Sequence, residues 1–251
     1  LGYRVWAPDL RGYGGSDRPR GVEHYALEHL LADVDGWIDA AGARGRTLLV
    51  AHDWGGIIAW LYAMRRPDAL ERLCVMNLPH PACYAEQLGP RQLARSWYVL
   101  AFQLPRLPEW FVGRDGRWAG EAMRRSASSP EVFDDAAVAP FVEAASQPGA
   151  ATAMIDYYRA AVRGGGFARQ RRLGFPPIEI PVLQLWGEPD IALTKASSFG
   201  AVRHVRQLVQ RYLPGTSHWV QQEAPERVNQ MLAAWLEDQP VPYADGSIAN
   251  F

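Results

Sequence analysis

The sequence contains almost no lysine, only two cysteines and no long uninterrupted apolar run. Lys195 is the sole lysine, and arginine supplies the rest of the 26 basic residues, which 27 acidic residues offset to a net charge of −1. This charge pattern lacks the basic surface that binds nucleic acid. No stretch approaches the roughly 18 apolar residues of a membrane span, and no signal peptide is recognisable. These absences predict a cytoplasmic protein that binds neither nucleic acid nor membrane.

Cys74 and Cys83 are too few for a disulfide framework and lack the spacing of metal ligands. We therefore expect neither a metal nor another cofactor. With 251 residues, 48% of them hydrophobic, the chain can bury one large core, with or without an inserted segment. The sequence carries no signal for an oligomeric state.

Short apolar runs alternate with amphipathic stretches near both ends of the chain, which predicts a parallel α/β sheet. The strands expected first are residues 3–8, 47–51 and 73–78, and the helices are residues 23–41 and 57–66. The pattern resumes with strands at 180–186 and 207–213, a helix within 192–205 and a closing helix at 225–236. The tail from residue 239 is expected to be loosely held.

Between these two parts, residues 79–177 have helical patterns and many aromatic residues but no convincing strand. A helix-rich stretch inside an α/β pattern is typical of an inserted cap. We therefore expect a core in two parts, residues 1–78 and 178–251, with helices on both faces of a mostly parallel sheet. Residues 79–177 are expected to form the helical cap.

The clearest local signal is the segment Ala51-His52-Asp53-Trp54-Gly55-Gly56, between a predicted strand and a predicted helix. A nucleophile elbow places its central residue on a sharp strand-to-helix turn with a small residue two positions away on either side. Here Ala51 and Gly55 are the small residues and Asp53 is the central one. Aspartate also caps helices, but the rest of the chain favours a catalytic Asp53.

An aspartate at the elbow restricts the reaction. A serine that attacked a saturated carbon would form an ether, which water does not readily cleave. A carboxylate forms an ester instead, which a general base and water can hydrolyse. Asp53 therefore predicts alkyl transfer from epoxides or alkyl halides rather than ordinary ester hydrolysis.

The general base is expected to be His218. In elbow hydrolases the acid and then the histidine follow the nucleophile along the chain, and His218 follows the last predicted strand across a short loop. The other five histidines have weaker placements: two on an early helix and expected at the surface, two flanking strand ends and one in an arginine-rich stretch, which are His24, His29, His52, His80 and His204 respectively.

The acid that orients the base is expected directly after the strand that ends at Trp186. Glu188 and Asp190 both qualify by position, and Asp190 is favoured. Some elbow hydrolases place this acid after the preceding core strand. That strand ends here in Asn77-Leu78-Pro79-His80, which offers no carboxylate.

Taken together, four motifs resemble those of soluble epoxide hydrolases of the α/β-hydrolase superfamily, and the resemblance spans nearly the whole chain. They are Pro8-Asp9-Leu10-Arg11-Gly12-Tyr13-Gly14-Gly15-Ser16, the elbow, Trp186-Gly187-Glu188-Pro189-Asp190 and Ser217-His218-Trp219. The resemblance implies an α/β-hydrolase fold in which Asp53, Asp190 and His218 are nucleophile, acid and base. It also implies a small apolar epoxide and water as substrates and a vicinal diol as product.

The family's cap supplies two tyrosines whose hydroxyls hold the epoxide oxygen. The resemblance gives Tyr98 as the first, and the register of Asp156-Tyr157-Tyr158-Arg159 favours Tyr158 over Tyr157 as the second. The N–H of Trp54, directly after the nucleophile, is implied as one donor of the oxyanion hole. Three aromatic residues are expected to line the substrate site, namely Trp97, Phe102 and Trp219.

One family motif is missing, the His-Gly-x-Pro loop that gives the second oxyanion donor, and the chain enters a predicted strand directly after Leu1. We therefore expect that the N-terminal strands are absent and that the chain is a fragment. One alternative is a haloalkane dehalogenase with the same triad, although a departing halide needs no proton from paired tyrosines. The other is an inactive fragment or a ligand-binding relative.

Overall fold

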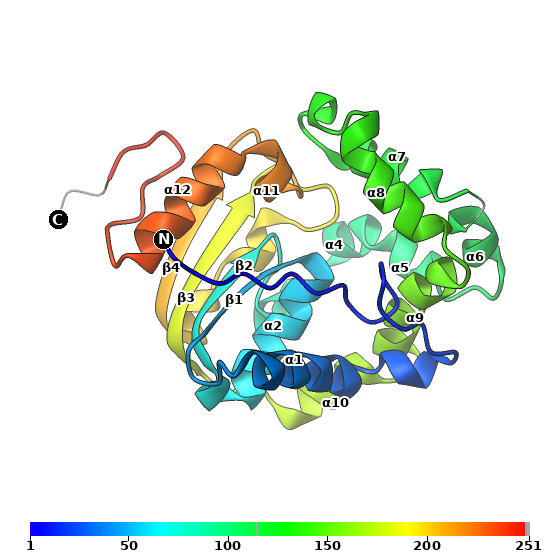
Figure 1. Ribbon diagram of the computed structural model, residues 1–251, viewed down its shortest axis with the longest axis horizontal. Coiled ribbons are helices and arrows are strands. Elements are labelled where there is room, and N and C mark those ends of the chain that lie inside the picture. The colour runs from blue at the N-terminus through cyan, green and yellow to red at the C-terminus, as the bar shows by residue number, and fades with distance from the viewer. Residues whose placement is uncertain (114, 249–251) are drawn as a thin grey trace. The chain divides into compact units, whose positions relative to one another are not determined.

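The computed structural model describes residues 1–113 and 115–248, and the chain divides into two compact units (Figure 1). The helical unit comprises Leu1–Asp33, Ser96–Arg125 and Ser129–Gly174. The sheet unit comprises Val34–Arg95, Ser126–Ser128 and the chain from Phe175 on. None of the described helices combines the length and the hydrophobicity needed to cross a bilayer.

Four parallel strands in the order β1-β2-β3-β4 form the sheet. They are β1 (Thr47–His52), β2 (Leu70–Met76), β3 (Ile178–Gly187) and β4 (Val205–Leu213). The two central strands carry nearly continuous apolar runs because both of their faces are covered. The predicted α/β class with a parallel sheet is confirmed.

The helices of the sheet unit follow the strands in the expected alternation. α1 (Leu27–Ala41) begins in the helical unit and ends in the sheet unit. The others are α2 (Asp53–Arg65), η2 (Pro67–Ala69), α3 (Pro81–Glu86), α4 (Pro90–Arg95), η4 (Lys195–Ser198), η5 (Ala201–Arg203), α11 (Val220–Glu223) and α12 (Pro225–Leu236), where η denotes a 3₁₀ helix. The closing helix has the predicted bounds.

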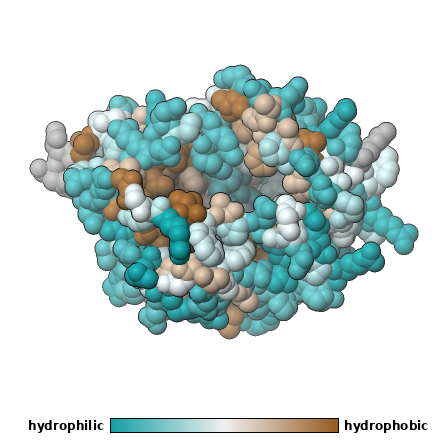
Figure 2. Space-filling model, viewed as in Figure 1, coloured by the Kyte–Doolittle hydropathy of each residue, from teal (hydrophilic) through white to brown (hydrophobic). Residues whose placement is uncertain are grey.

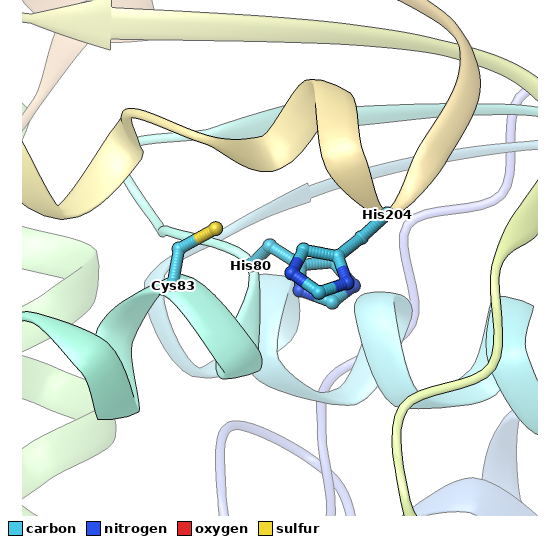
Figure 3. Close-up of side chains that lie close together, drawn as sticks. All are labelled: His80, Cys83 and His204. Carbon is cyan, nitrogen blue, oxygen red and sulfur yellow. The ribbon is translucent and has the colours of Figure 1, made fainter.

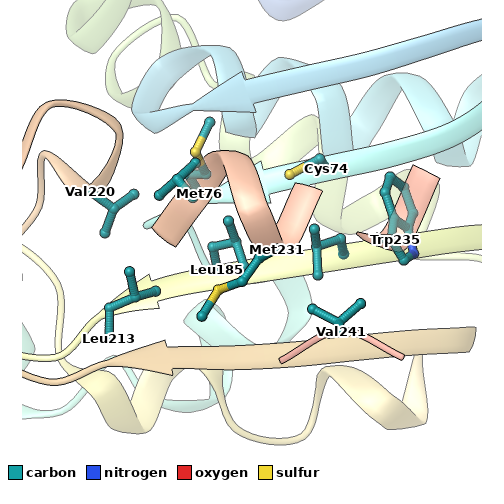
Figure 4. Close-up of a cluster of buried hydrophobic side chains, with 10 residues drawn as sticks. Cys74, Met76, Leu185, Leu213, Val220, Met231, Trp235 and Val241 are labelled. Carbon is teal, nitrogen blue, oxygen red and sulfur yellow. The ribbon is translucent and has the colours of Figure 1, made fainter. Parts of the chain in front are cut away.

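Helices pack on both faces of the sheet, and β2 shows how. Successive residues of a strand point to opposite faces. Val75 faces α2 so closely that a Cβ on Gly56 would lie 3.1 Å from Val75 Cγ1. Cys74 points the other way and belongs to a buried apolar cluster that includes Met231 and Trp235 of α12 (Figure 4).

The helical unit packs around α9 (Ala150–Val162), whose small buried residues let its neighbours approach closely. Its other helices are η1 (Val22–Tyr25), α5 (Trp97–Ala101), α6 (Leu107–Val112), α7 (Arg117–Ser126), η3 (Pro130–Val132), α8 (Asp135–Ser146) and α10 (Gly166–Leu173). The buried Arg159 donates to the carbonyls of Phe102 and Leu104 at 3.0 and 2.7 Å and pairs with Glu109 and Asp156. No strand occurs among the described residues of 79–177. The helical unit differs from the predicted cap in its bounds, because it also contains Leu1–Asp33 and leaves residues 79–95 to the sheet unit.

The predicted strand at residues 3–8 was wrong. The segment has no regular structure, and Tyr3, Val5 and Trp6 are each at least half exposed. Apolar side chains are visible on the otherwise largely hydrophilic face in Figure 2. A hydrophobic run becomes a strand only where a neighbouring strand accepts and donates its backbone hydrogen bonds, and an apolar pattern cannot supply that neighbour.

Two further expectations near the C-terminus were wrong. Residues 192–205 form η4 and η5 rather than an α-helix, because the hydroxyls of Ser197 and Ser198 bond to backbone carbonyls and Gly200 adopts a φ of 86°. The tail is also held at its start. Arg211 donates to the carbonyl of Val241 at 2.6 Å, and Val241 is buried in the apolar cluster of α12.

Candidate active site

Asp53 lies at the junction of β1 and α2 with a φ of 48°, a value that few residues other than glycine adopt. The strained turn presents a side chain that is 40% exposed. A Cβ on Gly55 would lie 3.8 Å from Ala51 Cβ, so the two small positions face each other. The tightest packing is one residue further on, where a Cβ on Gly56 would meet Leu78 at 3.0 Å.

The structure brings three of the predicted residues together at the carboxyl end of the sheet. His218 Nε2 lies 3.5 Å from Asp53 Oδ1, and His218 Nδ1 lies 2.7 Å from Asp190 Oδ2. His218 and Asp190 are both buried. The imidazole is therefore held firmly by one carboxylate and more loosely by the other, more exposed one.

Asp190 rather than Glu188 orients the imidazole. Its Oδ1 accepts the N–H groups of Ala192 and Leu193 at 2.7 and 2.9 Å, so the buried carboxylate has several donors. Glu188 instead forms an ion pair with Lys195, at 2.5 Å. The single lysine of the chain thus binds the competing carboxylate.

Asn77, at the end of β2, is a site residue that the sequence reasoning missed. Its amide donates to Asp190 Oδ2 at 2.9 Å and to the carbonyl of Gly187 at 3.2 Å, and its Oδ1 accepts the N–H of Gly187 at 2.8 Å. This strand end offers no carboxylate, and an acid was the residue type expected there. A polar residue at the end of a buried strand beside the acid's strand was the available signal, because the carboxyl ends of parallel strands meet.

Gly187 is required at the end of β3 because the loop that carries His218 passes directly over it. A Cβ at this position would lie 1.9 Å from the carbonyl oxygen of Ser217 and 2.4 Å from that of Thr216. Ser217 is fixed in turn by Glu223, which accepts its N–H at 3.1 Å. These contacts fix the position of His218 relative to the carboxyl ends of the strands.

Two aromatic side chains pack beside the His218 ring. His52 Nε2 donates to the carbonyl of His218 at 2.8 Å, and the two rings lie 4.5 Å apart. The ring of Trp219 lies 5.1 Å from that of His218, and its N–H donates to Ser126 Oγ at 2.7 Å. Burial and the charge of His218 lower the pKa of His52 to about 4, so His52 is neutral.

The three charged groups shift one another's pKa values strongly. Burial alone would raise the pKa of Asp53, but the hydrogen bond and charge of His218 lower it to about 2. Burial alone would lower the pKa of His218, but Asp190 and then Asp53 raise it to about 10. The N–H of Trp54 also binds the Asp53 carboxylate. At neutral pH the site therefore holds an imidazolium between two carboxylates.

In the helical unit, Tyr98 and Tyr158 pack edge to face, with ring centroids 5.8 Å apart. Phe102 completes the group, 4.9 Å from the Tyr158 ring. Tyr157 is fully buried, and its hydroxyl donates to the carbonyl of Arg11 at 2.7 Å. Tyr157 is therefore a packing residue, which favours Tyr158 as the second of the predicted tyrosines. Trp97, expected to line the substrate site, is 66% exposed.

A family model described as the alpha/beta hydrolase fold matches residues 1–225 of this sequence. The chain belongs to the alpha/beta hydrolase fold family. It is 35% identical over 241 residues to the AB hydrolase superfamily protein YfhM of Bacillus subtilis. The aligned region covers 95% of this chain and 82% of that protein.

Relatives named epoxide hydrolases also match. Epoxide hydrolase 3 of Xenopus tropicalis is 36% identical over 250 residues, covering 94% of this chain and 65% of that protein, so the chain spans about two thirds of that relative. A crystal structure of Bacillus megaterium epoxide hydrolase in complex with an inhibitor matches with a TM-score of 0.79 at 26% identity, covering 91% of this chain and 82% of that one. The resemblance seen in the sequence motifs is confirmed.

Proposed function

We propose that this chain is an epoxide hydrolase that opens small apolar epoxides to vicinal diols. The observation that supports this proposal most directly is the position of the Asp53 carboxylate. Asp53 stands at the elbow with Oδ1 3.5 Å from His218 Nε2, while the other ring nitrogen binds Asp190. The named relatives support the choice of an epoxide, and exposed apolar residues of α5 and α6 such as Trp97 and Trp110 support an apolar one.

In the proposed first step, Asp53 attacks a ring carbon of the epoxide from the side opposite the ring oxygen. An ester bond forms as the carbon–oxygen bond of the ring breaks. We assign to Tyr98 and Tyr158 the proton that the ring oxygen takes up, because the two phenols lie together in one aromatic group. The phenolate regains a proton from solvent, and the imidazolium of His218 releases one to solvent, which leaves His218 neutral.

In the second step, the loss of the Asp53 charge removes one of the two carboxylates that raise the pKa of His218. Neutral His218, oriented by Asp190, then takes a proton from water as the water oxygen attacks the ester carbonyl. The N–H of Trp54 is assigned to the oxyanion, where such a donor contributes about 3 kcal/mol. Breakage of the ester releases the diol, and the proton from water ends on His218 beside a regenerated Asp53 carboxylate.

Substrate class is the direct test. Purified chain is assayed for diol formation from styrene oxide and, in parallel, for halide release from a bromoalkane. We expect diol without halide. Halide release without diol would favour the haloalkane dehalogenase, and a folded chain that does neither would favour an inactive fragment or a ligand-binding relative.

A second test separates the two steps. His218→Gln should still form the ester but not hydrolyse it, so mass spectrometry should find a protein heavier by one substrate, modified in the peptide that contains Asp53. His29→Gln, at an exposed position, is the matched control and should turn over like the wild type. Normal turnover by His218→Gln would mean that the base lies elsewhere.

A further inference from the structure

Three metal-ligating side chains that the proposed reaction does not use gather in the sheet unit. They are His80, Cys83 and His204, and one ligand atom from each lies within 4.8 Å of the others (Figure 3). His80 directly precedes α3, Cys83 lies within α3, and His204 stands between η5 and β4. His80 and Cys83 are three residues apart, but His204 comes from a distant part of the chain, so sequence spacing alone does not bring the three together.

The polar atoms of the two imidazoles are poorly satisfied. His80 and Cys83 are fully buried, and His204 is half-buried. His80 Nε2 and His204 Nε2 are both buried without a hydrogen-bond partner, and His80 Nδ1 accepts only the N–H of Ala82, at a long 3.3 Å. Buried polar atoms normally have partners, so two neighbouring exceptions beside a thiol point to a missing ligand.

We propose that His80, Cys83 and His204 bind one Zn²⁺ ion. Imidazole nitrogen and thiolate sulfur are the donors that zinc takes in proteins, usually in tetrahedral geometry. Water is the fourth ligand in this proposal. On binding, the Cys83 thiol releases its proton to solvent as the zinc–sulfur bond forms. Burial and the charge of Glu86 raise the pKa of the free Cys83 thiol, and Arg203, which hydrogen-bonds to it, opposes this in part. Bond formation to the metal therefore has to drive the loss of the proton.

Binding requires a small rearrangement of the ring pair. The rings of His80 and His204 are stacked, with centroids 4.6 Å apart and planes only 4° from parallel. An ion bound to an imidazole nitrogen lies in the plane of that ring, so it cannot lie in both parallel planes. Tetrahedral zinc also brings its ligand atoms to about 3.3–3.6 Å from one another, given the usual bond lengths. His204 is the half-buried partner and therefore the ring with room to turn.

The cluster shares no residue with the triad. His204 directly precedes β4 and His218 follows it, so these two histidines lie at opposite ends of a nine-residue strand. His80 is closer to the triad, since it follows Asn77, which binds Asp190, by three residues or about 10 Å of extended chain. A zinc ion here would tie α3 to the start of β4 and would act on stability rather than on the proposed hydrolysis.

Metal titration of the whole chain tests the proposal. After chelator treatment and desalting, Zn²⁺ is added in a calorimeter, and Co²⁺ is added in a spectrophotometer. We expect one ion per chain, a thiolate-to-cobalt charge-transfer band and a higher melting temperature with zinc. Cys83→Ala should remove the band, and both Cys83→Ala and His204→Gln should weaken zinc binding at least about tenfold, since even partners outside the metal's ligands contribute that much.

Two control variants test whether zinc binding is specific to the proposed ligands. Cys74→Ala removes the other buried thiol, which lies in the apolar cluster of α12, and should bind zinc like the wild type. His24→Gln disrupts a surface pair with His29, whose rings are 6.4 Å apart, and should also bind normally. No stoichiometric binding by wild type, binding unchanged in folded Cys83→Ala and His204→Gln, or loss of binding in His24→Gln would overturn the proposal.

Discussion

Each unit of the molecule contains a trio of charged residues, and the two trios are built differently. In the helical unit, Arg159 pairs with Glu109 and Asp156, and its remaining N–H groups bond to backbone carbonyls. In the sheet unit, His218 stands between two carboxylates, 2.7 Å from Asp190 but 3.5 Å from Asp53.

The difference lies in what each trio leaves accessible. The Arg159 side chain is 7% exposed, and Asp156 is 4% exposed, so neither can meet a substrate. Asp53 is 40% exposed and sits on a strained turn, although its charge is stabilised by His218. We call Arg159, Glu109 and Asp156 the closed trio, because it can only stabilise the fold. We call His218, Asp190 and Asp53 the open trio, because its exposed carboxylate can react with a substrate.

Removing the open carboxylate should have the largest effect. Asp53→Asn keeps the shape of the side chain and tolerates the positive φ, but it provides no anion to attack an epoxide. Turnover should fall by about 10⁴-fold or more, with little change in the free energy of unfolding. Asp238→Asn is the control, since Asp238 also has a positive φ, at 56°, but lies on the surface and pairs with Arg72. Residual turnover near the wild-type rate would exclude Asp53 as nucleophile.

Breaking the closed trio should instead lower stability. Arg159→Met leaves two carboxylates without their cation, and removing one partner of a buried ion pair costs about 3–5 kcal/mol. Urea unfolding measures the change. Arg163→Met, one helical turn further along and exposed, should cost far less. Equal losses in the two variants would mean that the Arg159 interactions contribute little.

A smaller effect is expected at the residue that supports the acid of the open trio. Asn77→Ala removes one donor to Asp190 and two bonds to Gly187. A hydrogen bond to a charged group contributes about 1.5–3 kcal/mol, so kcat should fall about 10–100-fold while KM changes less. Asn229→Ala, exposed on α12, is the control. A changed KM with an unchanged kcat would place Asn77 outside the positioning of the triad.

The sequence predicted the parts of the site that depend on local chain geometry. The elbow around Asp53 is a strand, a turn and a helix in direct succession. Because the ends of parallel strands meet, His218 could be placed from its strand, and the acid could be narrowed to Glu188 or Asp190, with Asp190 favoured. Asn77 was missed because its role depends on the register between β2 and β3, which fixes Gly187 and Asp190 beside it. Register is a tertiary property that an apolar run does not encode.

The cap and the ends of the chain were harder to predict for the same reason. That Tyr157 packs and Tyr158 joins Tyr98 follows from which side of α9 meets the loop at Arg11. Two adjacent tyrosines on a helix differ by about 100° in direction, and periodicity alone does not say which face is covered. The segment at residues 3–8 is apolar enough for a strand, yet no described strand pairs with it.

The stability of the protein should depend on pH through His218. In the folded protein, Asp190 and Asp53 raise the pKa of His218 to about 10, against about 6.5 for histidine in an unfolded chain. Between these values the folded state holds a proton that the unfolded state has released, so the free energy of unfolding falls as pH rises. The stabilisation is fully present below about pH 6.5 and is lost as the pH passes through about 10, and each unit of pKa difference contributes about 1.4 kcal/mol.

Urea unfolding at a series of pH values across this window tests the charge state of the open trio. Wild type should lose stability steadily, and His218→Gln should show a flatter profile because no imidazole remains to titrate. Asp53→Asn should end its decline at a lower pH than wild type, because only Asp190 then stabilises the imidazolium. Arg159→Met should be less stable throughout. The same slope in wild type and His218→Gln would contradict an imidazolium held between two carboxylates.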